Sequence, residues 1–323
     1  MKKNKDTSLS IGVDIGGTKI LTALINSGGE VMFSTKNATD PSRPINKIID
    51  DIVRAVEYVQ EKVKQSASYI GVGFAGQVDA NGVVHRAPNL GWKDVDLKTL
   101  LEKKTDLPVH ITNDVRAATW GEWKFGAGKG YEDIVVVFIG TGIGGGIVSD
   151  GKLLLGHTGT GGEIGHITLV EDGRKCRCPN YGCIEAYAGG WAIAERAQVA
   201  LENFKGDSLI TSNGRSVQGI TAADVTHAFR QGDLLAEKLV LETGRLLGSG
   251  LIGIVNSFNP KVLILGGGVI ENLPELIPIA EERLRKFALR PGIDALELCR
   301  AALGGTAGAI GAADMAREVL SRG

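Results

Sequence analysis

The sequence has few aromatic residues, few cysteines and no long apolar run. Aromatic residues make up 5% of the 323 residues, and four cysteines are present. The longest plainly apolar run is residues 134–139, whereas a membrane-spanning helix needs about 20 residues. We therefore expect no membrane-spanning segment and no membrane partner.

Charge of either sign is not in excess. Lys and Arg number 36 against 37 Asp and Glu, which gives a net charge of −1. This balance argues against a basic surface spread over the chain, although a local basic patch stays open, and we expect no nucleic-acid partner. The N-terminal residues are polar, so we expect no signal peptide before the first strand. These features predict a cytoplasmic protein.

Glycine is abundant, and the cysteines are clustered. The chain has 46 glycines, about twice the usual share of about 7%, which indicates close backbone approaches or sharp turns at several places. Cys176, Cys178 and Cys183 lie close together. A cytosolic chain keeps such thiols reduced, and clustered cytosolic cysteines indicate metal ligands.

The first third of the chain has an α/β pattern. Apolar strands at 9–14, 20–25 and 30–33, separated by turns at 15–19 and 26–29, predict a three-stranded meander. Apolar residues at steps of three and four over 45–63 predict an amphipathic helix. Further strands at 70–74 and 109–112 complete an alternation that is typical of α/β folds.

The pattern then starts again. Residues 134–139 predict a strand, 140–144 a glycine-rich turn, 145–149 a second strand and Asp150-Gly151 a hairpin turn. Two unrelated hairpins would explain this; we favour duplicated domains that each present a glycine-rich hairpin to one ligand. A helix at 234–258 is apolar on nearly every side, so it is expected to be buried, with its glycines allowing close packing.

The first glycine-rich turn, at 14–19, reads Asp-Ile-Gly-Gly-Thr-Lys. Two glycines expose backbone N–H groups, so the turn can hold phosphate, with Asp14 placed for Mg²⁺ or its waters. A tight hairpin turn that binds no ligand would have the same sequence pattern. The turn is neither a Walker A loop, which ends in Gly-Lys-Ser/Thr, nor a dinucleotide fingerprint, because a strand follows it.

Three glycine-rich stretches together resemble the actin-like sugar kinases. Residues 14–19, 140–146 and 266–268 are similar to their two phosphate motifs and adenosine motif. Glu-Ile-Gly-His at 163–166 and Cys-Arg-Cys-Pro-Asn-Tyr-Gly-Cys-Ile-Glu at 176–185 resemble the ROK family of repressors, open reading frames and kinases, and within it the bacterial glucokinases. The resemblance covers essentially the whole chain.

This resemblance implies two duplicated actin-like (ribonuclease H-like) α/β domains around a cleft. The small domain would hold residues 1–118 plus 303–323, and the large domain, 119–302, would carry a zinc-binding loop and a dimer surface. ATP, Mg²⁺ and a structural Zn²⁺ are the implied cofactors, and a homodimer is the implied assembly. The implied nucleotide contacts are Asp14, Gly16, Gly17, Thr18, Lys19, Gly140, Thr141, Gly142, Gly266 and Gly267.

One histidine and three cysteines are the candidate metal ligands. Together they offer one nitrogen and three sulfurs, the donor set of a closed structural Zn²⁺ site. Unligated reduced thiols are the alternative. The resemblance implies the same four ligands, and a site with all four positions filled by protein cannot activate water. The predicted ligands are His166, Cys176, Cys178 and Cys183.

Asp114 is the candidate catalytic base. It follows the strand at 109–112, and a helix is expected to begin at Val115, so Asp114 could simply cap that helix. The resemblance implies instead that Asn113 binds ring hydroxyls and that Asp114 accepts the proton of the attacking primary hydroxyl. The catalytic Asp of protein kinases has the same role.

Further sugar contacts are implied by the same resemblance. Ionised carboxylates accept short hydrogen bonds from sugar hydroxyls, which suits Glu163 and Glu185 for this task. Solvated surface acids are the alternative for each glutamate alone. His166 would bind zinc through one ring nitrogen and face the sugar with the other. The loop Pro-Asn-Leu-Gly-Trp at 88–92 contributes Asn89, and Gly76 would allow backbone approach.

The predicted activity is ATP-dependent phosphorylation of the 6-hydroxyl of glucose. An N-acetylmannosamine or N-acetylglucosamine kinase is the alternative within the family, and polyphosphate is an alternative donor. A sugar-responsive repressor is a remote alternative. Such repressors carry a helix-turn-helix domain before the first phosphate motif, and here about ten residues precede that motif.

Overall fold

The computed structural model describes residues 8–87, 89–204 and 206–321. The chain divides into two compact units: unit 1 comprises residues 1–130, 156–159 and 302–323, and unit 2 comprises residues 131–155 and 160–301. The boundaries expected from the sequence were residues 118 and 303. Unit 1 therefore continues about twelve residues past the expected boundary at 118, through the rest of α3 (Asp114–Lys124) and the segment that follows it.

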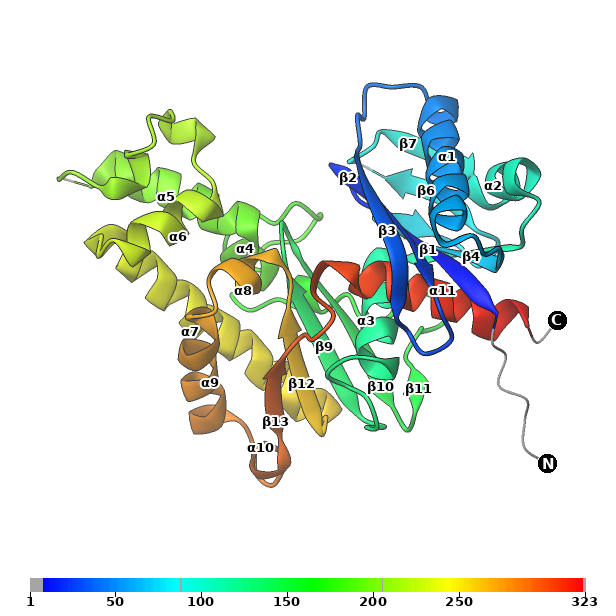
Figure 1. The fold of residues 1–323 in the computed structure, drawn as a ribbon. Coiled ribbons are helices and arrows are strands. Elements are labelled where there is room, and N and C mark those ends of the chain that lie inside the picture. Colours follow the sequence, from blue (N-terminus) through cyan, green and yellow to red (C-terminus); the bar gives the residue numbers. More distant parts are fainter. Residues whose placement is uncertain (1–7, 88, 205, 322–323) are drawn as a thin grey trace. The chain divides into compact units, whose positions relative to one another are not determined.

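Unit 1 is built on a five-stranded sheet (Figure 1). The strand order is β3-β2-β1-β4-β8; β1, β2 and β3 are antiparallel neighbours, and β4 and β8 run parallel to β1. The predicted meander and the strands after it are thus confirmed, with β3 longer than expected. The bounds are β1 (Leu9–Ile15), β2 (Lys19–Ile25), β3 (Val31–Ala38), β4 (Ala67–Phe74) and β8 (Val109–Asn113).

The helices of unit 1 cover both faces of this sheet. Helix α1 (Ile45–Val63), predicted with these bounds, and α2 (Leu97–Thr105) pack on the face that carries Ile11 and Val13. Helix α11 (Ala307–Leu320) contacts β1 and β4, and it packs against α3 (Asp114–Lys124). A small antiparallel sheet is formed by β5 (Gln77–Val78), β6 (Val83–Ala87) and β7 (Trp92–Asp96).

Glycines bring α11 directly onto its neighbours. A Cβ at Gly12 of β1 would lie 1.9 Å from the carbonyl oxygen of Ala309, and a Cβ at Gly71 of β4 would lie 1.8 Å from that of Ala312. A Cβ at Gly311 would lie 1.7 Å from the carbonyl oxygen of Ala117. Part of the glycine excess is therefore explained, because helix and strand backbones touch at these positions.

Unit 2 repeats the sheet of unit 1. Its strand order is β11-β10-β9-β12-β13, with antiparallel pairs β10–β11 and β9–β10 and parallel pairs β9–β12 and β12–β13. Order and directions match those of unit 1, so the duplication is a feature of the fold. The bounds are β9 (Ile134–Ile139), β10 (Ile143–Ser149), β11 (Lys152–Leu153), β12 (Val262–Gly266) and β13 (Glu297–Arg300).

Helix α7 (Leu234–Phe258), predicted with these bounds, is the central helix of unit 2. By length and composition it could span a membrane, but more than half of its most apolar stretch is buried inside the unit. A Cβ atom at Gly244 would clash with Ile279, and one at Gly248 would clash with Ala280; both contacted residues lie in α9 (Leu276–Phe287). A Cβ atom at Gly253 would meet only open space. The other helices are α4 (Glu185–Ala188), α5 (Gly190–Asn203), α6 (Ala222–Arg230), α8 (Gly268–Asn272), α9 (Leu276–Phe287) and α10 (Gly292–Ala295).

Candidate functional site

The first glycine-rich turn joins β1 to β2 at an edge where other predicted residues gather. The Gly16 N–H donates to the carbonyl of Lys19 at 3.0 Å, and Thr18 and Lys19 are exposed. A Cβ at Gly17 would lie 2.8 Å from the Cβ of Asn89. The turn therefore lies against the predicted sugar loop, of which Pro88 lies outside the described residues.

Asp14 and Asp114 form a pair of carboxylates in unit 1. Burial, together with the negative charge of Asp114, raises the pKa of Asp14 to about 6, although Lys19 acts in the opposite direction. A Cβ at Gly308 would lie 3.0 Å from the Cγ of Asp14, so the first turn of α11 covers this carboxyl. Two neighbouring carboxylates are hard oxygen donors that suit Mg²⁺, and the residues present fit this ion.

The strand-to-helix corner β8–α3 positions Asn113 and Asp114. Helix α3 begins at Asp114, one residue earlier than expected, and its N-cap is Asn113, whose Oδ1 accepts the N–H of Arg116 at 3.1 Å. The alternative in which Asp114 caps the helix is therefore wrong. The Nδ2 of Asn113 donates to Oδ1 of Asp114 at 3.0 Å and lies 3.5 Å from the carbonyl oxygen of Gly76.

Gly76 completes this group of residues. Its N–H donates to the carbonyl of Phe74 at 2.9 Å. A Cβ at Gly76 would lie 2.7 Å from the carbonyl oxygen of Arg86. The position has no space for a side chain, so the chain turns tightly there and brings its backbone beside Asn113.

In unit 2 the second glycine-rich turn joins β9 to β10. The Gly140 N–H donates to the carbonyl of Gly142 at 2.9 Å, and Thr141 is exposed. The carbonyl groups of Gly140 and Thr141 accept the N–H groups of Gly190 and Trp191 at the start of α5. Strand β10 begins at Ile143, inside the region expected to be turn.

Strand β12 of unit 2 ends at Gly266, and Gly267 follows it at the N-cap of α8. Gly267 has a φ of 91°, in the region that favours glycine. A Cβ there would lie 2.5 Å from the carbonyl oxygen of Ile139, at the end of β9. The adenosine motif expected from the sequence thus lies next to the second glycine-rich turn, at the carboxyl ends of neighbouring parallel strands.

The four predicted metal ligands of unit 2 converge. The ligating atoms of His166, Cys176, Cys178 and Cys183 all lie within 4.8 Å of one another. Nδ1 of His166 lies 3.7 Å from Sγ of Cys176, and the Sγ atoms of Cys178 and Cys183 are also 3.7 Å apart. Zn–S bonds of about 2.3 Å in a tetrahedron separate two sulfurs by about 3.75 Å, so the cluster fits zinc.

The loop around this cluster is shaped for its ligands. Gly182 has a φ of 73°, and a Cβ there would lie 1.7 Å from the carbonyl oxygen of Val170. Asn180 donates to Thr168 Oγ1 at 2.9 Å and lies 3.7 Å from Sγ of Cys183. Burial and the neighbouring thiols raise the pKa of Cys183 to about 12. A bound divalent cation would supply the positive charge that stabilises the thiolates.

Glu163 and Glu185 differ in their surroundings. Glu163 is exposed, and its Oε2 lies 4.0 Å from Nε2 of His166, the ring nitrogen that faces away from Cys176. Glu185 is 9% exposed. Its Oε2 accepts the N–H of Ile143 at 2.8 Å, and its Oε1 accepts Nε1–H of Trp191 at 3.2 Å.

Glu185 thereby connects the cysteine cluster to the second glycine-rich turn. Its Oε1 lies 3.8 Å from Sγ of Cys176, and a Cβ at Gly142 would lie 2.3 Å from its Oε2. The carboxylate therefore has a structural position that the sequence motif did not reveal. A sugar contact by Glu185 stays a prediction.

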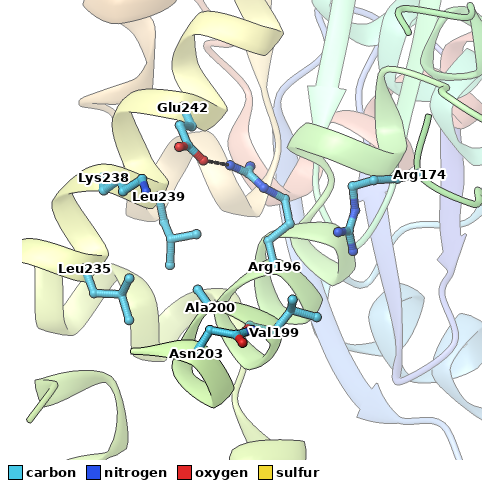
Figure 2. Close-up of a pocket in the computed structure, with 9 residues that line it drawn as sticks. All are labelled: Arg174, Arg196, Val199, Ala200, Asn203, Leu235, Lys238, Leu239 and Glu242. Carbon is cyan, nitrogen blue, oxygen red and sulfur yellow. Dashed lines mark hydrogen bonds and ion pairs between the residues drawn. The ribbon is translucent and has the colours of Figure 1, made fainter. Parts of the chain in front are cut away.

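A separate cavity of about 230 Å³ in unit 2 contains none of the predicted site residues (Figure 2). It lies between α5 and α7. Arg196 on its wall donates to the carbonyl of Tyr187, to Thr243 Oγ1 and to Glu242 Oε2, at 2.8–3.0 Å. These bonds give Arg196 a structural role in joining the two helices.

Glu122 is a buried carboxylate that no sequence motif pointed to. Glu122 in α3 is 0% exposed, and its oxygens accept backbone N–H groups of Ala127, Ala302 and Leu303. The sequence offered little signal for it, since two of these partners lie about 180 positions away along the chain.

The duplicated sheets and the strand-end turns define an actin-like α/β fold of the sugar-kinase class. The sequence matches the ROK family over residues 10–319, and the chain belongs to this family.

Relatives of the chain include enzymes and repressors. A glucokinase of Streptomyces coelicolor is 37% identical over 319 residues, 96% of this chain and 98% of that enzyme. A ROK glucokinase of Streptomyces griseus, solved with glucose and AMPPNP, is 38% identical with a TM-score of 0.83, over 96% of this chain and 99% of that one. A xylose repressor of Bacillus spizizenii is 30% identical over 98% of this chain and 78% of the repressor.

Proposed function

We propose that the protein transfers the γ-phosphoryl group of ATP to the 6-hydroxyl of glucose. The observation that carries this proposal is the position of Asp114, at the start of α3 and beside Asp14 and the first glycine-rich turn in unit 1. The glucokinases similar over nearly the whole chain support glucose and ATP as substrates.

Asp114 is the proposed general base. Its carboxylate accepts the proton of the 6-hydroxyl as that oxygen attacks the γ-phosphorus. A new O–P bond forms while the bond to the β-phosphate oxygen breaks, so ADP leaves with that electron pair. A general base contributes typically about 10²- to 10⁴-fold. Asn113, which donates to Asp114, keeps this carboxylate in place.

The remaining predicted residues are proposed as binding groups. Asn89, Asn113 and Gly76 in unit 1, and Glu163, His166 and Glu185 in unit 2, are the proposed sugar contacts. Mg²⁺ bound near Asp14 would offset phosphate charge. Zn²⁺ held by His166 and the three cysteines would order the loop that carries Glu163. The proposed nucleotide contacts are Asp14, Gly16, Gly17, Thr18, Lys19, Gly140, Thr141, Gly142, Gly266 and Gly267.

A coupled assay of ADP production tests the activity. The purified protein is supplied with Mg-ATP and, in turn, glucose, mannose, N-acetylglucosamine and N-acetylmannosamine, with polyphosphate replacing ATP in a second series. We expect the highest kcat/KM with glucose and ATP. A higher kcat/KM with either N-acetylated sugar would assign the alternative kinase activity, and turnover of none of them would refute the proposal.

We also propose a cytoplasmic homodimer and identify the two units with the two domains of the fold. An ATP-dependent enzyme needs the nucleotide pool of the cytoplasm, and the three clustered thiols need reducing conditions. Sedimentation at twice the chain mass of 34.0 kDa is expected. Sedimentation of the protein at the mass of one chain would refute the dimer.

A further inference from the structure

Glu122 lies where the polypeptide passes between the two units. The chain leaves unit 1 after Gly130 and returns to it at Ala302. Between these two points only the short segment 156–159 also belongs to unit 1. Oε2 of Glu122 accepts the N–H groups of Ala127 and Ala302, each at 3.0 Å, and Oε1 accepts the N–H of Leu303 at 2.8 Å. One carboxylate therefore binds both the outgoing and the returning segment.

The chemistry of this position requires a carboxylate. Burying an ionised group is costly unless it is hydrogen-bonded, and Glu122 is 0% exposed. Its two oxygens accept three backbone N–H groups, and such charge-assisted bonds are about twice as strong as neutral ones. A glutamine would offer one acceptor oxygen and would turn an NH₂ group toward an N–H donor.

The neighbouring backbone is shaped around this carboxylate. A Cβ at Gly126 would lie 2.2 Å from Oε2 of Glu122. The carbonyl group of Glu122 also accepts the N–H groups of Gly126 and Gly128, at 3.1 and 2.9 Å. Side chain and main chain of one residue thus fix the outgoing segment as it leaves α3.

The same helix carries the proposed base. Asp114 is the first residue of α3, and Glu122 lies two turns further along it. Helix α3 packs backbone to backbone on α11: a Cβ at Gly121 would lie 2.6 Å from the carbonyl oxygen of Ala307. Displacement of the connecting segments is therefore transmitted to a helix whose first residue takes part in the reaction.

We propose that Glu122 is a positioning residue for phosphoryl transfer: it holds the two connecting segments, 125–130 and 302–303, in a fixed place relative to the helix that carries Asp114. The effect on the reaction rests on the proposed function; the binding of the two segments does not. Displacement of a reacting group by about 1 Å can cost about 10²-fold in rate, and part of that loss is expected when the carboxylate is removed.

The test compares Glu122→Gln with Asp314→Asn. Asp314 is a second buried carboxylate of unit 1. It accepts Nε1–H of Trp120, which also lies in α3, at 2.8 Å, and it pairs with Arg317, so among the described residues its hydrogen bond and ion pair go to neither connecting segment. Both variants lose a buried charge, so a purely structural role predicts similar losses for both. Thermal unfolding, hydrogen exchange of peptides covering 125–131 and 299–305, and steady-state kinetics are measured on each protein.

We expect Glu122→Gln to exchange about 10-fold faster in both peptides and to lose about 10-fold in kcat. Asp314→Asn is expected to keep exchange in these peptides and kcat within two-fold of wild type. If the folded Glu122→Gln protein keeps wild-type kcat, or if Asp314→Asn loses as much, the proposal is overturned. If Glu122→Gln fails to fold, Gly126→Ala, whose Cβ is directed at the carboxylate, is judged by the same criteria.

Failure of the proposed function is recognised separately. A wild-type protein that phosphorylates none of the four sugars refutes that function, and with it the effect of Glu122 on the reaction. The hydrogen-exchange experiment then tests only whether Glu122 holds the two connecting segments in place. Unchanged exchange in Glu122→Gln would show that this carboxylate does not hold the two segments, whatever the protein does.

Discussion

Replacing Asp14 by asparagine is expected to stabilise the protein at neutral pH while it removes activity. Burial and the charge of Asp114 raise the pKa of Asp14 from 3.8 to about 6. Above that pH the folded protein must hold an ionised carboxylate in a place that disfavours it. An asparagine has nearly the same shape and carries no charge, so this cost disappears with the substitution.

The sign and size of the effect follow from the pKa. Between pH 4 and 6 the folded state retains a proton that the unfolded chain has lost, so the free energy of unfolding of the wild type falls as pH rises and levels off above pH 6. The shift from 3.8 to about 6 corresponds to about 3 kcal/mol at about 1.4 kcal/mol per pKa unit. About 2 kcal/mol of this change falls between about pH 4.5 and 7.5.

The assay is urea unfolding of wild type and Asp14→Asn across this pH range, in buffer without added Mg²⁺. We expect the stability difference to grow with pH in favour of the variant. Asp50→Asn is the control, because a hydrogen bond from Lys104 lowers the pKa of Asp50 and its removal acts in the opposite direction. A difference between wild type and Asp14→Asn that is the same at every pH would refute the reasoning.

Three further substitutions separate catalysis, metal binding and positioning. Asp114→Asn should lower kcat by about 10²-fold or more while calorimetry still detects glucose binding. Its free energy of unfolding should change little, because Asn113 caps the helix. A near-normal kcat would exclude the base role. Cys178→Ser should contain no zinc when its metal content is measured by elemental analysis, and it should melt at a lower temperature. Cys299→Ser is the control and should keep its zinc, because Cys299 lies outside the cluster. Full zinc content in Cys178→Ser would contradict the ligand assignment. Glu185→Gln should raise KM for glucose, as expected of a sugar contact, and also KM for ATP, because its carboxylate accepts the N–H of Ile143 after the second glycine-rich turn. A rise confined to KM for glucose would show that the bond to Ile143 does not position that turn.

The regular elements were accessible from the sequence because their signals are local. The apolar steps of three and four over 45–63 gave the bounds of α1, and the run at 134–139 gave those of β9. The duplicated strand-turn-strand pattern also favoured duplicated domains, and the two sheets do share one strand order. The start of α3 was misplaced by one residue, because Asn113 and Asp114 are both good N-cap residues and the sequence alone does not decide between them.

The candidate site was predictable only in its motifs. The cysteine spacing identified a cluster whose ligating atoms do converge. The roles that depend on distant partners were not accessible: Glu122 reads as an ordinary helix glutamate until Ala302 and Leu303 are brought beside it. Glu185 belongs to a recognisable motif, yet its bonds to Ile143 and Trp191 depend on the packing of β10 and α5.

The position of α11 in the chain has a consequence for biosynthesis. The face of the first sheet that carries Leu21, Ala23 and Ile25 is covered by Ala309 and Ile310 of α11, which the ribosome makes after all of unit 2. Unit 2 is nearly continuous in sequence and can fold while synthesis proceeds. The corresponding face of the N-terminal sheet stays exposed to solvent until α11 has been synthesised. The nascent chain is therefore expected to need protection from aggregation until its last helix emerges, and translational pausing before residue 307 would prolong that exposure.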